Sequence, residues 1–187
     1  MQTCQQLYTD WNDGASGAIR YLDRHNMVCP SNHALTNYNL EKAADGRIRY
    51  AYECCSIYRS LVSVESTQEV ETDQTIWGLP LEVQYLDRQT PKCPGKNQLI
   101  GRLRMRSSNS HIWYSLTCIQ LATGFIVDAG ATQTSSTFEI GSLLTYALDQ
   151  VEVGCDSSQY LLSTKLNMNY ATNPYTASFA IQCGGIR

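Results

Sequence analysis

Apolar and polar residues alternate with a period of two in three separate stretches of the chain. Each stretch ends in a cysteine, and the apolar positions are Ile48, Tyr50, Tyr52 and Cys54, then Ile112, Tyr114, Leu116 and Cys118, then Ala177, Phe179, Ile181 and Cys183. Such alternation is typical of half-buried β-strands. A shorter alternating pair precedes each stretch (Tyr38 and Leu40, Leu103 and Met105, Leu166 and Met168), and turn-forming residues lie between at 44–46, 107–109 and 172–174. The pattern predicts three antiparallel hairpins, and no long segment has helical periodicity.

A second motif repeats ahead of each hairpin. Tyr-Leu-Asp-Arg at 21–24 and again at 85–88 leads to a Cys-Pro pair, and Leu-Asp-Gln at 148–150 leads to Cys155. In every copy the leucine lies seven residues and the aspartate six residues before the cysteine. The copies recur at about 63 residues, which predicts three repeats. We place them at 21–84, at 85–147, and at 148–187 completed by 1–20.

Three repeats of this length indicate a single domain over residues 1–187. The predicted fold class is all-β, a closed pseudo-threefold body of three antiparallel repeats stapled by disulfides. Closure removes the exposed sheet edges that favour aggregation. A β-prism of three sheets fits units of this length, whereas the units of a β-trefoil usually run shorter.

The eight cysteines predict four disulfides. Cys29–Cys54 and Cys93–Cys118 have the same separation, and Cys155–Cys183 has nearly the same, so each is expected to staple one hairpin. Cys4–Cys55 then ties the amino-terminal segment to the first hairpin. The exchanged pairing, Cys29–Cys55 with Cys4–Cys54, stays open because sequence does not order adjacent cysteines. Four disulfides favour an oxidising compartment and a secreted, extracellular protein.

Composition narrows the function classes. Lys and Arg total 14 against 17 Asp and Glu, a net charge of −3, which argues against nucleic-acid binding through bulk positive charge. Apolar residues make up 43% of the chain, enough to bury a core. No apolar run reaches the roughly 18–20 residues of a membrane-spanning helix.

The hairpin pattern resembles two extracellular families. Cys29-Pro30 and the segment 48–55, in which an aromatic strand ends in a cysteine doublet, resemble a unit of the dermatopontin family. Cys93-Pro94-Gly95, followed by Ile112 and Cys118, is similar to a copy of the vitelline membrane outer layer protein I family, a threefold β-prism with four disulfides. Both resemblances imply a matrix or coat protein that engages glycans, proteoglycans or other matrix components. Some relatives with a threefold β-prism are instead membrane-targeting ends of perforin-like toxins.

The repeated Asp-Arg pair has two interpretations. Asp23 with Arg24 and Asp87 with Arg88 are structural if the carboxylate accepts backbone N–H bonds at a turn and the guanidinium pairs with a neighbouring acid. They are sugar-binding sites if the carboxylate and the guanidinium bind hydroxyl groups of a ligand. The third copy has Asp149 beside Gln150.

Aromatic residues are the second class of candidates. Trp11, Trp77 and Phe138 each precede a Leu-Asp pair by about ten residues. These aromatic side chains are expected either to fill the core or to stack on sugar rings. Trp11 lies in a polar turn, which favours exposure. Trp113 lies on the strand face opposite to Ile112 and Tyr114 and is expected to point outward.

A local basic stripe is the third candidate. Arg102, Arg104 and Arg106 alternate with Leu103 and Met105, so their side chains share one strand face. Lys92, Lys96 and His111 add positive charge in the same repeat. The stripe is either a solvated outer face or a site for a sulfated or acidic glycan, which arginine side chains suit.

Metal binding and catalysis find little support. Asp10, Asn12 and Asp13 before Gly14 have ligand types for calcium, but their spacing differs from an EF-hand and no distal glutamate follows. We therefore predict no metal and no cofactor, with calcium at this turn as the alternative. None of the three histidines lies in a nucleophile or metal motif, and every cysteine is expected to be bonded, so no enzyme is predicted. A glycan-active enzyme is the alternative, because its two catalytic carboxylates come together only in the folded protein and leave no signal in the sequence.

These observations predict a secreted, non-enzymatic protein that binds glycans or acidic matrix polysaccharide, with a lectin-like role in adhesion, agglutination or coat building. Matrix proteins are a further class of partner. One alternative is a membrane-targeting module of a pore-forming or defence protein, which would expose the apolar loop 76–81. A second alternative is a structural matrix protein that self-associates.

Overall fold

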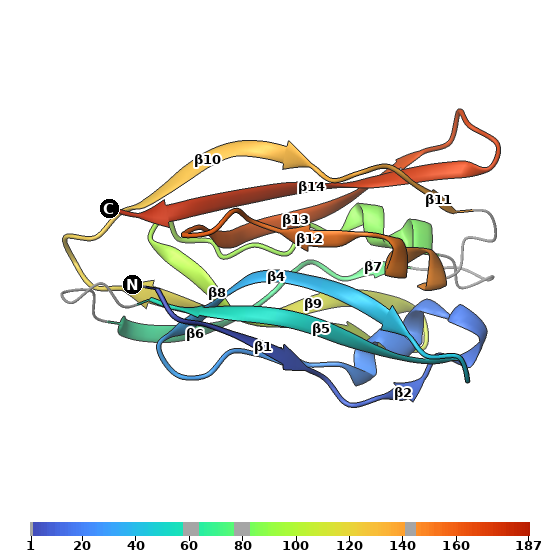
Figure 1. The fold of residues 1–187 in the computed structure, drawn as a ribbon, viewed down its shortest axis with the longest axis horizontal. Helices are drawn as coiled ribbons and strands as arrows, with labels where there is room; N and C mark the ends of the chain where they lie inside the picture. The colour runs from blue at the N-terminus through green and yellow to red at the C-terminus, as the bar shows by residue number, and fades with distance from the viewer. Residues whose placement is uncertain (1, 58–63, 77–82, 141–144) are drawn as a thin grey trace.

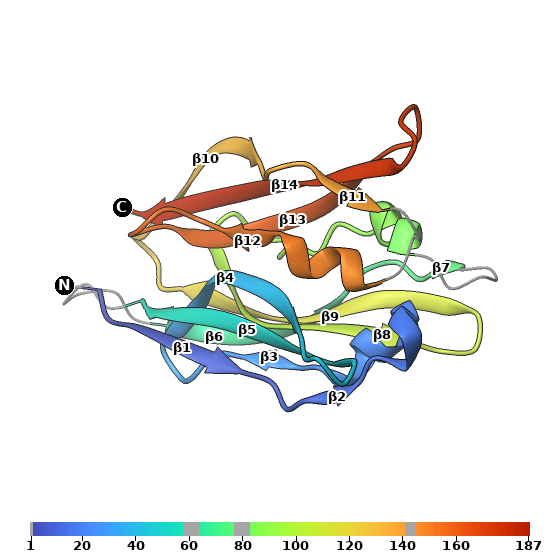
Figure 2. The ribbon, with the colours of Figure 1, turned by 45° about the vertical axis from the view of Figure 1, so that its right-hand side comes forward.

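The computed structural model describes residues 2–57, 64–76, 83–140 and 145–187. The described chain is mostly antiparallel β-structure, arranged in three sheets. The third sheet forms the upper layer in Figure 1, the first and second sheets lie below it, and both termini lie at the same end. Figure 2 shows the same layers after a turn of 45°.

The first sheet has the order β1-β5-β4-β12, and β2 also pairs with β5. Its strands are β1 (Cys4–Tyr8), β2 (Asn12–Asp13), β4 (His33–Lys42), β5 (Arg47–Ser56) and β12 (Glu152–Gly154). β4 and β5 form the first predicted hairpin. Gly46, with a φ of 86°, makes the turn between them, and Asp45 Oδ1 accepts the Arg47 N–H at 3.1 Å.

The second sheet has the order β3-β8-β9-β6, and β7 also pairs with β9. Its strands are β3 (Met27–Val28), β6 (Val64–Glu71), β7 (Thr75–Ile76), β8 (Gln98–Ser107) and β9 (His111–Leu121). The third sheet has the order β10-β14-β11, and β13 also pairs with β14. Its strands are β10 (Val127–Thr134), β11 (Phe138–Ile140), β13 (Tyr160–Asn169) and β14 (Tyr175–Ile186).

Each sheet is completed by a short segment from another repeat. β3, which precedes Cys29, pairs with β8, and β12, which precedes Cys155, pairs with β4. Lys92, which precedes Cys93, forms an isolated bridge with Ser163 of β13. The first repeat thus contributes to the second sheet, the second to the third, and the third to the first.

All three hairpins contain a β-bulge at the same place. The register shifts between Leu35 and Asn37, between Ile100 and Arg102, and between Leu161 and Ser163. The inserted residues are Thr36, Gly101 and Leu162. Because the bulge lies at the same place in every hairpin, it shows which residues of the three repeats correspond. It is a more reliable guide to this correspondence than the apolar pattern.

Short 3-10 helices hold the repeated Leu-Asp element. They are η2 (Ile19–Arg24), η3 (Val83–Arg88) and η4 (Thr145–Gln150), and a further one, η1 (Ala15–Gly17), precedes η2. Leu22, Leu86 and Leu148 are buried in the core. No helix in the described ranges is long and apolar enough to cross a membrane.

Four disulfides form in the pairing that the spacing predicts. They are Cys29–Cys54, Cys93–Cys118, Cys155–Cys183 and Cys4–Cys55. The first three span similar Cα–Cα distances of 5.5, 5.7 and 5.7 Å, as expected for copies of one device. Loops of this length stabilise a fold by roughly 3–4 kcal/mol each in the chain-entropy model.

The structure differs from the predicted closed body in two respects. The described strands form three separate sheets and no closed barrel, because the segments exchanged between repeats are too short to join the sheets into one. The amino-terminal strands β1 and β2 pair with β5 of the first sheet, which differs from the expected completion of the third repeat by residues 1–20. The third sheet takes its outer strands from 127–140 instead.

Candidate functional site: a basic hollow beside the Leu-Asp-Arg element

The aspartates of the repeated element connect adjacent repeats. Asp23 Oδ2 accepts a hydrogen bond of 2.5 Å from the Ser107 hydroxyl, at the end of β8. Asp87 Oδ2 accepts one of 3.0 Å from the Tyr170 hydroxyl, just after β13. Burial raises the pKa of Asp149, and the charge of Lys42 at the end of β4 opposes that rise. In the first two repeats the carboxylate therefore fixes a 3-10 helix to the next sheet, which agrees with the structural interpretation.

Two arginines at the first copy of this element, Arg24 within it and Arg20 just before it, have a different environment. The Arg20 and Arg24 guanidinium carbons lie 5.1 and 4.1 Å from the centre of the Tyr21 ring. Both arginines are exposed, and no carboxylate of the described residues forms an ion pair with either. Together with Asp23 and Ser107 they line a hollow of about 260 Å³ on the surface. We call this site, lined by Arg20, Tyr21, Asp23, Arg24 and Ser107, the basic hollow.

The predicted basic stripe shares one face of β8, but its three arginines have different partners. Arg104 donates from Nε and Nη2 to the Asp23 carbonyl, at 3.2 and 3.1 Å, and so supports the wall of the basic hollow. Arg102 donates to Ser115 Oγ at 2.7 Å and lies 3.4 Å from Glu69. Arg106 is half-buried and lies opposite Trp113 in the strand register. The stripe is therefore not a continuous free positive surface.

A related cluster surrounds Arg88 in the second repeat. Its guanidinium lies 5.0 Å from the Tyr85 ring centre, and its Nε lies 3.9 Å from Asp87. Beside it two tyrosines, Tyr170 and Tyr175, meet edge-on at 5.8 Å and are 52% and 40% exposed. Sequence reasoning missed this exposed pair, although its signal is visible as two tyrosines on either side of a turn.

The aromatic candidates do not form a threefold set. Phe138 is buried and packs on Phe179 at a centroid distance of 6.1 Å. Trp11 is half-buried, with the Arg49 guanidinium 4.4 Å from its ring centre, and that same guanidinium lies 4.1 Å from the Tyr8 ring. Trp113 is half-buried rather than openly exposed, and its Nε1 is buried without a partner among the described residues. Trp77 lies outside the described residues.

The register explains why the spacing of these aromatics misleads. Asn12 pairs with Ile48, and Phe138 pairs with Ala177, so Asn12 and Phe138 occupy equivalent positions. Trp11 lies one residue earlier than that position. The nearly equal distances from the Leu-Asp pairs therefore do not reflect one repeated site.

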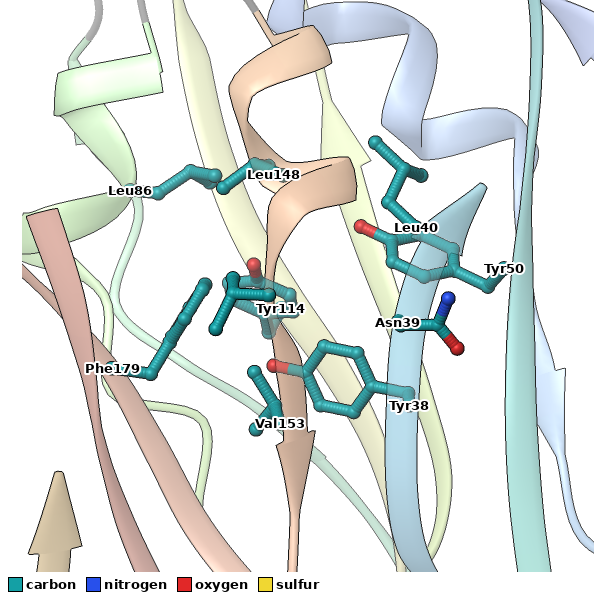
Figure 3. Close-up of a pocket in the computed structure, with 10 residues that line it drawn as sticks. Tyr38, Asn39, Leu40, Tyr50, Leu86, Tyr114, Leu148, Val153 and Phe179 are labelled. Carbon is teal, nitrogen blue, oxygen red and sulfur yellow. The ribbon is translucent and has the colours of Figure 1, made fainter. Parts of the chain in front are cut away.

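An internal cavity is lined by residues of all three repeats (Figure 3). Tyr38, Tyr50, Tyr114 and Phe179 surround it with Leu86 and Leu148. Its free volume of about 20 Å³ is close to that of one water molecule. Burial raises the pKa of Tyr38 to about 12, and burial likewise raises the pKa of Tyr50 and Tyr114. The tyrosines stay protonated at neutral pH, and the space is too small for a sugar.

Metal ligands are few in the described chain. In the acidic turn at 10–14, the Asp13 carboxylate is engaged within the turn itself, because its Oδ1 accepts the Ala15 N–H at 2.8 Å. The group of metal-ligand types that lies close together is Cys4, Glu53 and Cys55, and both of its sulfurs are bonded to each other. While this disulfide is closed, the group has no thiolate to offer a metal.

No protein-family model, curated protein or solved structure matches this chain. The chemistry of the site therefore rests on its own geometry.

Proposed function

We propose that this protein is a secreted, non-enzymatic protein that binds acidic carbohydrate, such as a matrix polysaccharide, at the basic hollow. The observation that carries the proposal is a pair of exposed guanidinium groups, Arg20 and Arg24, that both lie against the Tyr21 ring and form no ion pair with a carboxylate of the described residues. Arginine binds sulfate and carboxylate through two parallel N–H groups. The tyrosine edge and the Ser107 hydroxyl supply contacts for the sugar ring and its hydroxyls.

The second repeat supports the same proposal. Arg88 and Tyr85 repeat the stacking of an arginine on a tyrosine, and the exposed Tyr170 and Tyr175 lie nearby. The third repeat has Ala147 and Gln150 in place of that tyrosine and arginine. Two sites on one molecule would raise avidity for a polymer without a strong single site.

The proposal extends to architecture and location. We infer that the three sheets pack as a pseudo-threefold β-prism, which the cyclic exchange of short strands supports. Membership in the dermatopontin or vitelline membrane outer layer protein I family is a proposal that rests on cysteine and strand spacing alone. Secretion is supported by four disulfides, which are compatible with an extracellular protein.

Heparin chromatography tests the basic hollow. The Arg20→Gln/Arg24→Gln double variant is expected to elute at a clearly lower salt concentration than the parent, with an affinity loss of about tenfold or more. Arg187→Gln is a control because Arg187, near the carboxyl terminus, pairs with Asp128 at the opposite end of the molecule (Figure 1). It is expected to lower affinity far less than the double variant. Equal elution of the parent and the double variant would contradict the site.

Vesicle flotation tests the membrane-targeting alternative. That alternative depends on the segment 76–81, of which only Ile76 is described, with 66% exposure. Flotation of the parent with lipid vesicles, together with no retention on heparin, would favour that function over glycan binding.

A further inference from the structure

A second surface site lies on the second sheet, away from the basic hollow. Its free volume is about 350 Å³, within the range of about 300–1,000 Å³ that is typical of small-molecule sites. One wall is the segment 28–32, which contains the Cys-Pro turn, and the other is the start of β6, at Val64 and Thr67. Gly101, Arg102, Thr117 and Ile119 line the space between the two walls. We call this site the β8 groove.

The groove depends on a glycine at the bulge. A Cβ atom on Gly101 would lie 2.7 Å from Ile119 Cδ1, so the Ile119 side chain packs directly over Gly101 and any side chain at 101 would push it outward. The equivalent bulge residues are Thr36 in the first sheet and Leu162 in the third, and both carry side chains there. In the third sheet, Leu162 Cδ1 lies only 2.7 Å from where a Cβ of Gly184 would be. In the second sheet the Ile119 side chain takes the place that Leu162 takes in the third, and the space above this packed pair is the β8 groove.

The lining combines an apolar part with one charged group. Val64, Pro30 and the 44% exposed Val28 provide apolar surface, and the buried Ile119 forms the floor. Arg102 has a side chain that is 26% exposed, held by Ser115 Oγ and by Glu69 at 3.4 Å. Glu69 is itself 62% exposed, and its Oε1 also accepts a hydrogen bond of 2.5 Å from Thr117, so an incoming anion has to displace this exposed carboxylate from Arg102.

We propose that the β8 groove binds a small amphiphilic acid, with its apolar body on Val28, Pro30 and Val64 and its anionic head on Arg102. A carboxylate or sulfonate accepts two N–H groups of a guanidinium, and an apolar body gains from leaving water. The volume fits a single compact ligand, not a polymer chain. This site uses none of the residues of the basic hollow, so it stands or fails independently of glycan binding.

The test uses anilinonaphthalene sulfonate, a fluorescent probe with an apolar body and one negative charge. The folded parent is expected to bind it saturably at one site, and octanoate is expected to displace it more strongly than octanol does. Gly101→Leu pushes the Ile119 side chain into the groove and is expected to raise the dissociation constant of the probe about tenfold or more. Thr67→Trp fills it from the exposed edge strand and is expected to do the same without a change in the core.

Charge variants separate the anion site from simple apolar binding. Arg102→Gln is expected to weaken the binding of the probe and of octanoate but not that of octanol. Arg106→Gln, a matched change on the same face of β8, is expected to leave the binding of all three unchanged. Near-UV circular dichroism confirms that each variant is folded. Absence of saturable binding by the parent, parent-like binding in both filled variants, or an equal loss in Arg106→Gln would each overturn the proposal.

Discussion

His25 is a buried histidine whose protonation opposes folding. It is only 2% exposed, its Nδ1 lies 2.9 Å from Thr9 Oγ1, and its ring meets Tyr50 edge-on at 5.7 Å. Burial, assisted by the charge of Arg24, lowers the pKa of His25 to about 4, although Asp23 and Asp10 oppose the shift. Between that value and the ordinary 6.5 the unfolded chain binds a proton that the folded protein does not, so stability falls as the pH falls.

The expected pH dependence is specific to this side chain. The free energy of unfolding is expected to drop by roughly 1–2 kcal/mol between pH 7 and pH 5, before most carboxylates titrate. Urea unfolding at several pH values measures it. His25→Gln keeps a hydrogen-bonding group without the proton and is expected to flatten the profile, while His33→Gln keeps the parent's slope. An unchanged slope in His25→Gln would exclude this origin.

Single residues also explain where sequence matching fails. The apolar pattern matches Tyr38 and Leu40 with Leu166 and Met168, but the register places Thr164 and Leu166 there. Thr164 is a polar residue on an inward face, 3% exposed, and its hydroxyl accepts a hydrogen bond from Tyr38 at 3.4 Å. This buried polar residue breaks the apolar alternation of its strand. The sequence alone does not predict its burial, because its hydrogen-bond partner lies in another repeat.

At the scale of elements, the 3-10 helices η2 and η3 are each attached to a neighbouring repeat by their aspartate. η2 holds its position through Asp23, whose carboxylate accepts from Ser107 and whose carbonyl accepts from Arg104. The basic hollow lies between η2 and the end of β8, so its shape depends on this attachment.

A double-mutant cycle tests the attachment. Asp23→Ala and Ser107→Ala are each expected to cost about 1–2 kcal/mol of unfolding free energy, and the double variant is expected to cost clearly less than their sum. Denaturant unfolding provides the measurement. Ser66→Ala, on the exposed strand β6, is the matched partner and is expected to be additive with Asp23→Ala. Additivity of Asp23→Ala with Ser107→Ala would mean that the two groups are not coupled.

Long, local elements were predictable from the sequence, and short exchanged elements were not. The hairpins and their disulfides follow from alternation and spacing within one repeat. β3 and β12 are two and three residues long, too short to show a period, and their partners lie in another repeat. Asp23 and Arg24 were identifiable as candidates because they belong to the repeated motif. The contribution of Ser107 to their site was not, because it depends on contact between two repeats.

At the scale of the whole molecule, the three repeats share one main core. Buried residues from all three sheets, among them Leu40, Leu103 and Leu166, belong to the same cluster. A smaller cluster lies at the end of the molecule with the termini, where the Tyr160 hydroxyl of the third repeat donates to the Ser56 carbonyl of the first at 2.8 Å. A sheet that loses its neighbour therefore loses a short paired segment and one side of its core, so we expect the three repeats to unfold together.

Val153 in β12 allows a direct test of this coupling. It belongs to the third repeat, is 1% exposed, and pairs with Tyr38 of the first sheet. Val153→Ala is expected to cost about 1–3 kcal/mol. Because the repeats are expected to unfold together, native-state hydrogen exchange is expected to show the same loss of protection in the slowest amides of β5, β9 and β14. Val28→Ala, at the exposed valine of β3, is expected to leave protection nearly unchanged. A loss confined to β4, β5 and β12 would show that the first sheet opens by itself and that the repeats are separate folding units.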